Sequence, residues 1–134
     1  MTHLYRVIVP VNDIEAAADF YGAILNQSGM RVSPGRHYFE CGGTILACFD
    51  SKADGEQATS TPNPQHIYLS ENDLEAVYER CQAVRADFDD KKLQEGGPSL
   101  GEIATRPWGE RSFYLHDPFG NPVCFVDDKT VFTG

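Results

Sequence analysis

The sequence predicts an α+β fold in which two tandem βαβββ modules form curved mixed sheets around a cavity. Two observations carry this prediction. First, "NDIEA" at residues 12–16 returns as "NDLEA" at residues 72–76, sixty positions later (72 − 12 = 60). Second, each copy follows a segment rich in β-branched or aromatic side chains and precedes a hairpin pattern. A motif that recurs together with its flanking elements indicates a duplicated module.

A strand is predicted before each helix. Residues 4–11, "LYRVIVPV", are rich in β-branched side chains, and residues 66–70, "HIYLS", occupy the equivalent place in the second copy. The spacing that separates the two motifs also aligns Arg6 with His66. Because side chains alternate across a strand, four residues are expected on the sheet faces that the helices leave open: Arg6, Ile8, His66 and Tyr68.

Each repeated motif is predicted to begin an amphipathic helix. Asn12 and Asn72 are the expected N-caps, because an Asn side chain can accept a hydrogen bond from the first helical turn. Glu15 and Glu75 follow three residues later and are expected to close capping boxes. Apolar residues then recur at helical spacing and predict one buried stripe per helix: Ile14, Ala17, Ala18, Tyr21, Ile24 and Leu25 in the first, and Leu74, Val77, Tyr78, Cys81 and Val84 in the second.

A β-hairpin is predicted after each helix. Gly42 and Gly43 turn the first hairpin, and "DPFGN" at residues 117–121 turns the second. The hairpin strands are expected at residues 37–41, 44–49, 111–116 and 122–127. Aligning Gly43 with Gly120 gives an offset of 77 (120 − 43 = 77), which places Ala47 on Cys124.

The offset between the hairpins is larger than the offset between the helix motifs, which indicates an insertion in the second module. The stretch "DKKLQEGGPSLGEIATRPWG" is rich in Gly and Pro, and predicts an enlarged loop with one short strand at residues 102–106. The chain is expected to consist of a first module (1–50), a polar linker (51–65) and a second module (66–134), together one domain. Because each helix covers one sheet face, the other faces are expected to enclose a cavity or to pair with another copy.

Composition narrows the possible partners. The chain has 134 residues and a formal net charge of −9, which argues against nucleic acid because phosphate binding needs a basic face. No apolar run approaches about 18 residues and no signal peptide is visible, so we expect no membrane partner and a cytoplasmic location. The cysteines lack CxxC spacing and are expected to be reduced thiols: Cys41, Cys48, Cys81 and Cys124.

Two segments carry a resemblance to a known family. "VNDIEAAADFY" at residues 11–21 and "FYLHDPFGNPVCFVD" at residues 113–127, in a βαβββ order that occurs twice, resemble the vicinal oxygen chelate superfamily. That superfamily includes the glyoxalase I, bleomycin-resistance and extradiol dioxygenase families. The resemblance covers essentially the whole chain. It implies the fold but not the reaction, because one fold hosts many functions.

The resemblance also implies where a metal would bind. In the metal-dependent members, His or Glu from the first and last strands of each module hold a divalent ion, which keeps positions open for a substrate with two adjacent oxygens. The matching positions here are Arg6, Ala47, His66 and Cys124. A guanidinium cannot donate electrons to a metal, and alanine has no donor atom. We therefore expect no cofactor, with a divalent metal as the alternative.

A ligand pocket is predicted on the open sheet faces. Its expected residues are Arg6, Tyr38, Ala47, His66, Tyr68, Trp108 and Cys124. Arg6 and His66 are expected to face each other and to clamp an anion; alternatively, Arg6 pairs with a carboxylate and His66 is an ordinary satisfied polar residue. Trp108 either stacks on a flat ligand, as the bleomycin-resistance relatives imply, or anchors its own loop.

Other polar residues near these positions have alternative interpretations. Cys124 is either an activated thiol or a space-filling side chain. Arg106 and Arg111 flank Trp108, and either receive an anionic group or are solvated surface charges. His116 and Asp117 are expected to be structural, because a His-Asp pair without a nucleophile forms no triad.

Three functions stay open. The first is a metal-free protein that binds a small organic molecule, as bleomycin-resistance proteins do. The second is a metal-dependent lyase, isomerase or oxidoreductase of the glyoxalase or dioxygenase type. The third is a metal-free enzyme that uses Arg6, His66 or Cys124 for acid–base or nucleophilic chemistry. The expected partners are a small-molecule ligand and a second copy of the chain, because homodimers are common in this superfamily.

Overall fold

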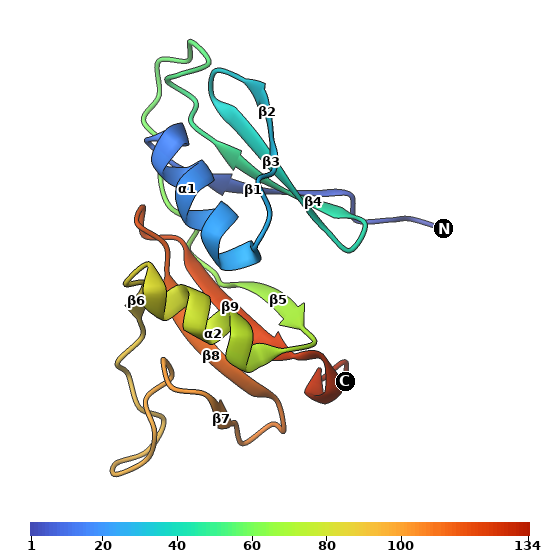
Figure 1. The fold of residues 1–134 in the computed structure, drawn as a ribbon, viewed down its shortest axis with the longest axis vertical. Helices are drawn as coiled ribbons and strands as arrows, with labels where there is room; N and C mark the ends of the chain where they lie inside the picture. The colour runs from blue at the N-terminus through green and yellow to red at the C-terminus, as the bar shows by residue number, and fades with distance from the viewer. The chain divides into compact units, whose positions relative to one another are not determined.

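The computed structural model describes all residues from Met1 to Gly134. They form two compact units, Met1–Asn63 and Pro64–Gly134. Each unit contains one α-helix and one mixed β-sheet (Figure 1), which confirms the predicted α+β class.

The first unit is a four-stranded sheet with one helix. Its elements are β1 (Arg6–Pro10), α1 (Ile14–Leu25), β2 (Met30–Ser33), β3 (Arg36–Cys41) and β4 (Thr44–Phe49). The strand order is β1-β4-β3-β2; β1 is parallel to β4, and the other pairs are antiparallel. The predicted turn between β3 and β4 is confirmed. Gly42 and Gly43 have φ values of 61° and 95°, which residues other than glycine rarely adopt.

The sheet face that α1 covers forms the core of the first unit. Val9, Phe39 and Cys48 are fully buried there, and Tyr21 and Ile24 are fully buried on α1. Along each strand, the buried side chains alternate with side chains of the opposite face. Burying such a side chain contributes about 1.5–3 kcal/mol of hydrophobic free energy, so this face fixes which side of the sheet stays available for a ligand.

Both helices begin one residue later than the sequence indicates. Asp13, and not Asn12, caps α1, and its carboxylate accepts a hydrogen bond from the backbone N–H of Ala16 at 3.1 Å. The second unit repeats this arrangement with Asp73 in place of Asn72. An aspartate at this position also adds a negative charge at the positive end of the helix dipole, which an asparagine does not.

The predicted capping boxes are therefore wrong. Glu15 and Glu75 lie two residues after the N-cap, one short of the position from which a glutamate side chain reaches back. They form ion pairs instead, Glu15 with Arg31 and Glu75 with Arg111. Each pair ties a helix to the sheet of its own unit.

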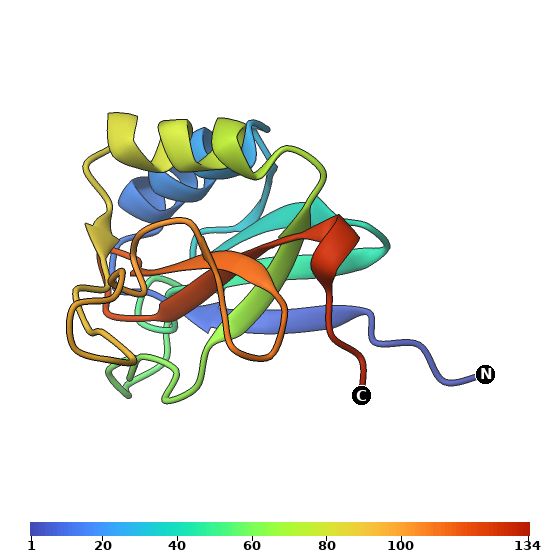
Figure 2. The ribbon, with the colours of Figure 1, turned by 90° about the horizontal axis from the view of Figure 1, so that it is seen from below.

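The second unit has the same plan with an enlarged loop. Its elements are β5 (Ile67–Glu71), α2 (Leu74–Ala83), β6 (Asp87–Phe88), β7 (Ala104–Thr105), β8 (Arg111–His116), β9 (Pro122–Asp127) and a short 3-10 turn (Asp128–Thr130). The strand order is β5-β9-β8-β6, and β7 also pairs with β8. Figure 2 shows α2 lying along one face of this sheet. The predicted strand at 102–106 shrinks to β7, and α2 ends before Val84, which is its C-cap.

The repeat predicted from the sequence is visible in the register of the parallel strands. Ile8 lies opposite Ala47 in the first unit, and Tyr68 lies opposite Cys124 in the second. The offset between the helix motifs aligns Ile8 with Tyr68, and the larger offset between the hairpins aligns Ala47 with Cys124. Equivalent residues therefore pair with equivalent partners, so the alignment of the modules is correct at these positions.

Residues 51–63 pack on the first unit. Ser60 donates a hydrogen bond to the carbonyl of Val11 at 2.9 Å, and Asn63 donates one to the carbonyl of Ile8 at 3.2 Å. The carboxylate of Asp54 accepts from the backbone N–H of Gly35 at 2.6 Å. This polar stretch therefore belongs by its contacts to the unit that precedes it.

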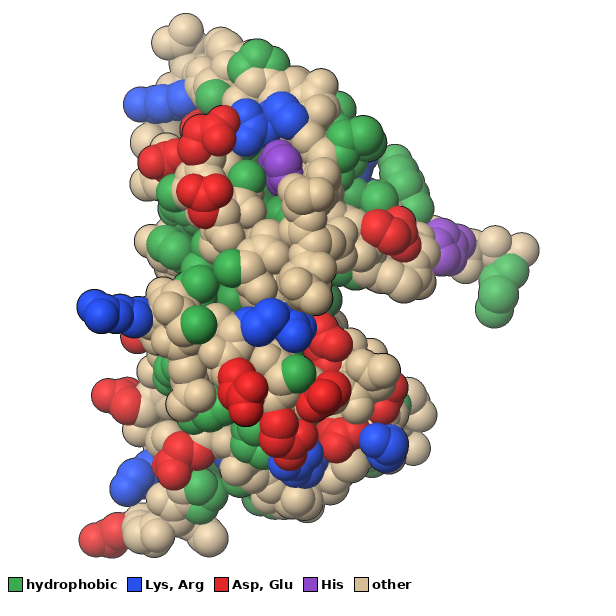
Figure 3. Space-filling view, viewed as in Figure 1, with side chains coloured by type: hydrophobic (Ala, Val, Ile, Leu, Met, Phe, Trp, Pro, Cys, Tyr) green, Lys and Arg blue, Asp and Glu red, His purple; other side chains and the backbone are tan.

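The four cysteines are free, as predicted, and Cys48, Cys81 and Cys124 are buried. Neither α1 nor α2 is long and apolar enough to cross a membrane. Figure 3 shows acidic side chains gathered on the visible face of the second unit with basic ones among them, which fits the negative net charge of the chain.

Candidate functional site

Each sheet has one face that its helix does not cover, and we call these the first and second open faces. The first open face carries Arg6, Ile8, Tyr38 and Ala47, and the second carries Tyr68, Tyr114, Cys124 and Val126. This placement follows from the alternation of side chains along each strand. The predicted pocket residues on these strands therefore lie on the open face of their own unit.

Three residues form one row on the first open face. Ala47 lies between Ile8 on β1 and Tyr38 on β3, and it is fully buried. Arg6 is exposed and donates a hydrogen bond from Nη1 to the Tyr38 hydroxyl at 3.0 Å. Within the first unit it forms no ion pair with a carboxylate, and the alternative in which Arg6 pairs with a carboxylate of the cavity stays a prediction.

The second open face has an equivalent row. Cys124 lies between Tyr68 on β5 and Tyr114 on β8. His66 precedes β5, and its ring lies 5.2 Å from that of Tyr114 and 6.1 Å from that of Tyr68. The rings of Tyr68 and Tyr114 lie 6.3 Å apart in an edge-on arrangement. One imidazole and two phenols thus form an aromatic cluster beside Cys124.

His66 is the polar centre of this cluster. Its Nε2 atom is buried and has no hydrogen-bond partner. Burial lowers the pKa of His66 from its ordinary value, and the positive charge that His116 can carry lowers the pKa further. A neutral imidazole with an unused ring nitrogen can accept a hydrogen bond or a proton from a ligand, or donate a hydrogen bond in the other tautomer.

Cys124 has the surroundings of an unreactive thiol. It is fully buried, and burial raises its pKa to about 12. A reactive cysteine needs a lowered pKa so that the thiolate is populated near neutral pH. Burial likewise raises the pKa of Tyr114. Of the two interpretations of Cys124, the space-filling one agrees with these surroundings.

The donor atoms at the four metal-site positions do not suit a divalent ion. The first open face supplies a guanidinium and a methyl group, neither of which can donate electrons to a metal. The second unit supplies the imidazole of His66 and the thiol of Cys124, which burial keeps protonated. No group of three or more His, Cys, Asp or Glu side chains is placed to hold a metal ion. Zinc and other divalent sites use three or four such donors.

A groove of about 470 Å³ opens on the second unit. Its walls are aromatic and aliphatic side chains from β5, β9, the β7–β8 loop and the C-terminal tail: Tyr68, Leu69, Trp108, Val126, Val131 and Phe132. Ser70 and Glu110 supply its polar groups. The exposed fractions of Tyr68 (59%), Trp108 (41%) and Phe132 (62%) leave three aromatic surfaces open to a ligand. The volume lies in the range of small-molecule sites, which is about 300–1,000 Å³.

Glu110 orders two walls of this groove. One carboxylate oxygen accepts a hydrogen bond from the indole N–H of Trp108 at 2.9 Å, and the other accepts from the backbone N–H of Phe132 at 2.9 Å. Glu110 therefore holds the tryptophan and the tail in fixed positions. The two predicted roles of Trp108 are compatible with each other, because the indole is anchored in its loop and still exposes part of its surface.

Arg106 is neither a surface charge nor an anion receptor, so both interpretations of this residue were wrong. Its side chain is buried (4% exposed), and Nη2 donates to the carbonyl oxygens of Leu100, Glu102 and Ser112 at 2.7–2.9 Å. Its guanidinium lies over the ring of Tyr114, 5.6 Å from the centroid. Arg106 thus fastens the enlarged loop to β8, because one guanidinium donates to carbonyl groups of both segments.

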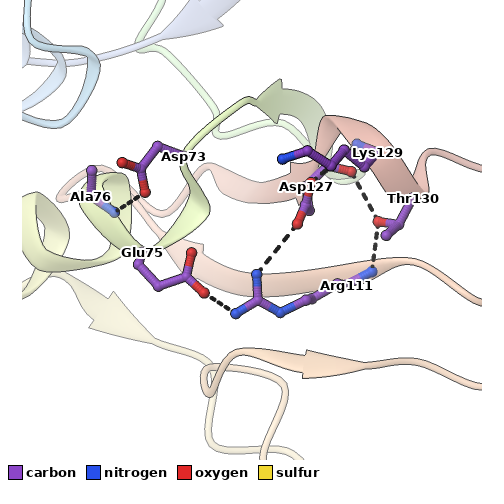
Figure 4. A network of polar contacts seen from close by, with 7 residues as sticks. All are labelled: Asp73, Glu75, Ala76, Arg111, Asp127, Lys129 and Thr130. Carbon is purple, nitrogen blue, oxygen red and sulfur yellow. Dashed lines mark hydrogen bonds and ion pairs between the residues drawn. The ribbon is translucent and has the colours of Figure 1, made fainter.

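Arg111 is committed to a network at the end of β8 (Figure 4). Its guanidinium forms ion pairs with Glu75 on α2 and with Asp127 at the end of β9. Its backbone N–H donates to the hydroxyl of Thr130 at 2.9 Å. Because its guanidinium is already paired with two carboxylates, Arg111 is not free to receive an anionic group.

The structure brings together some of the predicted residues. Tyr68 and Trp108 line one groove, and Arg6 contacts Tyr38. Arg6 and His66 belong to different units, and their facing each other stays a prediction. Sequence reasoning missed Tyr114, although its position opposite Cys124 matches that of Tyr38 opposite Ala47. The alternation that placed Cys124 on the open face would have placed its hairpin partner there too.

Asp117 has the structural role that was predicted for it and for His116. The carboxylate of Asp117 accepts hydrogen bonds from the backbone N–H groups of Phe119 and Asn121 at 2.9 and 2.8 Å. Asp117 is buried, and these bonds close the turn between β8 and β9. The turn fixes the register that sets Tyr114 opposite Cys124.

Solved structures with this fold are numerous. A glyoxalase-related enzyme from Fulvimarina pelagi matches with a TM-score of 0.73 and 17% identity, over 100% of both chains. Lactoylglutathione lyase from Agrobacterium tumefaciens matches with a TM-score of 0.68 and 19% identity, over 96% of both chains. TioX from Micromonospora sp. ML1 matches with a TM-score of 0.68 and 18% identity, over 94% of this chain and 98% of that chain. At these identities the likeness shows the fold alone.

Comparison with curated proteins found no match. A family model matches residues 3–125, which is nearly the whole chain. It covers both repeated motifs, both helices and the four positions at which metal-binding relatives are expected to carry ligands. The protein therefore belongs to the Glyoxalase/Bleomycin resistance protein/Dioxygenase superfamily.

Proposed function

We propose that this protein binds a flat organic molecule in the groove of the second unit, without a metal ion. The observation that supports the proposal most directly is the groove itself, in which the exposed rings of Tyr68, Trp108 and Phe132 surround a space of about 470 Å³. Aromatic side chains bind flat ligands by stacking and edge contacts, and gain further from the apolar area that is buried.

The charge of the groove favours a neutral or cationic ligand. Glu110 is the ionisable carboxylate in its lining, and a carboxylate can accept more hydrogen bonds than the two that it receives from Trp108 and Phe132. The net charge of −9 acts in the same direction, because it repels anions from the surface as a whole. A planar cation would combine stacking with attraction to this carboxylate.

The donor chemistry supports the metal-free part of the proposal. A ligand held by a divalent ion needs open coordination positions on an ion that the protein already holds with three or four donors. The four expected positions supply one imidazole and one buried thiol. Binding by stacking needs no such ion.

The test is a titration of the protein with planar neutral, cationic and anionic compounds. Binding is monitored by the fluorescence of Trp108, the only tryptophan. Quenching or a shift of the emission by neutral or cationic compounds, with a weaker effect of anionic ones, is the expected result. Tyr68→Ala is expected to weaken binding by about tenfold. Tyr5→Ala, which removes an equally exposed tyrosine (61%) from the first unit, is the matched control. Binding that is insensitive to Tyr68→Ala would contradict the proposal.

A second function has a specific observation in its favour. His66 has a buried Nε2 without a partner, a lowered pKa and two phenols beside it. A neutral imidazole in such a place can act as a general base. A metal-free enzyme that uses His66 would show turnover that falls as the imidazole becomes protonated, and His66→Ala would abolish it.

Metal analysis separates both functions from the metal-dependent alternative. Protein purified without chelators is expected to carry no stoichiometric divalent ion. A bound ion that is lost in His66→Ala would reject the metal-free proposal and favour the lyase or oxidoreductase chemistry of the metal-dependent relatives.

A further inference from the structure

Two arginines of the first unit converge on one tyrosine. Nη1 of Arg6 donates to the Tyr38 hydroxyl at 3.0 Å, and Nη1 of Arg36 donates to the same oxygen at 3.3 Å. Because both Nη1 atoms bind one oxygen, the two guanidiniums lie close together. Since β4 lies between β1 and β3, the Arg6 side chain crosses the middle strand to reach Tyr38. Nothing in the sequence pattern singles out Arg36.

This arrangement places more positive than negative charge at one point. Arg36 has one acidic neighbour, Asp54, at 3.7 Å, and its guanidinium lies 4.1 Å from the centroid of the Phe49 ring. Arg6 has only phenol oxygens as hydrogen-bond partners, those of Tyr38 and Tyr5, and its guanidinium also lies 5.2 Å from the ring centroid of Tyr5. A phenol oxygen accepts a hydrogen bond but does not neutralise a guanidinium. Two neighbouring like charges repel each other, and a bound anion would relieve that repulsion.

The remaining carboxylate of this face is directed elsewhere. Glu40 lies in the same cross-strand row as Ile45 and Arg6, but its carboxylate accepts a hydrogen bond from the backbone N–H of Gly43 in the β3–β4 turn. The Tyr38 oxygen accepts from both arginines, which leaves its O–H free to donate. Two guanidiniums and one hydroxyl therefore offer donors at the same place.

We propose that Arg6, Arg36 and Tyr38 bind the carboxylate of a small organic acid. A guanidinium matches a planar carboxylate with two parallel hydrogen bonds, and charge-assisted bonds of this kind are the stronger ones in proteins. Ile8 and Phe49 lie on the same sheet face and would contact the apolar part of the acid. The site lies wholly in the first unit, so it goes beyond the function proposed for the groove and does not depend on it.

The experiment is isothermal titration calorimetry of the full chain with benzoate, with its neutral analogue benzamide and with inorganic phosphate. Benzoate is expected to bind and benzamide to give no measurable heat of binding. Arg6→Gln and Arg36→Gln are each expected to raise the Kd for benzoate by about 10- to 100-fold, because each removes a charged donor. Tyr38→Phe is expected to have a smaller effect, because both guanidiniums remain.

Arg31→Gln is the matched control. Arg31 belongs to the same sheet and carries the same charge, but it lies on the helix side, where it pairs with Glu15 at 2.7 Å. Equal losses of affinity in Arg31→Gln and Arg6→Gln would mean that benzoate binding depends only on the net charge of the protein, which would overturn the proposal. Equal affinities for benzoate and benzamide would overturn it as well, and tighter binding of phosphate would replace the carboxylate with a phosphate as the ligand.

A measurement on the unaltered chain keeps the proposal testable if a variant fails to fold. Titration with benzoate is expected to shift the backbone amide resonances of residues 6, 36 and 38, and benzamide is expected to leave them unchanged. The fluorescence of Trp108 reports on the groove of the second unit, so a failure of one site can be told from a failure of the other. Shifts confined to the second unit would overturn the carboxylate site.

Discussion

The guanidinium of Arg106 lies over the ring of Tyr114, 5.6 Å from its centroid, in the interior of the second unit. The two residues come from different parts of the fold, the enlarged loop and β8. Because the loop is the insertion that distinguishes the second module from the first, this contact joins the new segment to the duplicated framework. The open face that carries Tyr114 therefore depends on a residue outside the repeat.

Replacing Arg106 with methionine should destabilise the protein. The methionine keeps an apolar stem but removes the side-chain donor to the Glu102 carbonyl, and one of the two donors to the Leu100 carbonyl, which also accepts from the backbone N–H of Tyr114. We expect a loss of about 3 kcal/mol in the free energy of unfolding, measured by urea denaturation. Lys92→Ala, which removes an exposed positive charge from the same loop, should change the free energy by less than about 0.5 kcal/mol. Equal effects of both variants would mean that Arg106 does not anchor the loop.

The titration of His66 should be displaced toward acid. Burial lowers its pKa, so the folded chain keeps this imidazole neutral to a lower pH than the unfolded chain does. The unfolded state then binds the extra proton first as the pH falls. The contribution of His66 to stability is thus present above about pH 6.5, the ordinary pKa of histidine. This contribution is lost as the pH falls from there to the folded-state pKa.

Nuclear magnetic resonance of the histidine ring protons measures this directly. His66 should titrate at a lower pH in the folded chain than in the chain unfolded in urea. His66→Gln should remove part of the pH dependence of stability in the same window. A His66 that titrates at the same pH in the folded and unfolded chains would contradict the burial of its ring and weaken its candidacy as a general base.

The fold could be predicted from the sequence because the repeat constrains it twice. The motif at residues 12–16 locates β1 and α1, and the same motif at residues 72–76 locates β5 and α2. Because the two copies agree, Ala47 could be aligned with Cys124 from the sequence. The strand register of both units matches this alignment. Local details were missed where neighbouring residues can do the same task, as Asn12 and Asp13 can at a helix N-cap.

The candidate sites were harder to predict because they depend on residues outside the repeat. Arg36 and Glu110 lie at a strand start and in a loop, where no periodic pattern says which way a side chain points. Arg106 resembles a surface charge in the sequence, because a buried arginine is recognisable only from the carbonyl groups around it. Tyr68 could be identified because side chains alternate along its strand, and Trp108 because it is the only tryptophan.

Glu110→Ala should loosen the walls of the groove. It removes the acceptor of the Trp108 indole N–H and of the Phe132 backbone N–H. Trp108 emission should shift to longer wavelength, and amide hydrogen exchange at residues 131–134 should become faster. Glu95→Ala, which removes an exposed carboxylate from the same enlarged loop, is the control and should change neither signal. An unshifted emission in Glu110→Ala would mean that the indole is held by packing alone.

Acid should weaken the network around Arg111. The hydrogen bond from Arg111 lowers the pKa of Glu75. The pKa of Asp127 is lowered mainly by the hydrogen bond from the backbone N–H of Lys129, and further by the hydrogen bond from Arg111. A depressed folded-state pKa contributes stability above the unfolded-state value, and this contribution is lost as the pH falls below about 4. Arg111→Ala should therefore be less stable than the unaltered protein at neutral pH, and the difference should shrink at about pH 3. Urea denaturation at both pH values measures it, and a difference independent of pH would assign the effect of Arg111 to packing.

The four thiols should differ in reactivity according to burial. Cys124 and Cys81 are fully buried, and burial raises the pKa of each to about 12, so almost no thiolate is present at about pH 8. Cys41 is partly exposed and should react with a thiol reagent such as Ellman's at a measurable rate in the folded protein. The three buried thiols, Cys48, Cys81 and Cys124, should react only after unfolding in urea, when all four cysteines become accessible. Mass spectrometry after labelling with iodoacetamide locates the modified residues. Rapid modification of Cys124 in the folded chain would restore it as a candidate nucleophile, because it would show that the open face admits a reagent and populates the thiolate despite the burial.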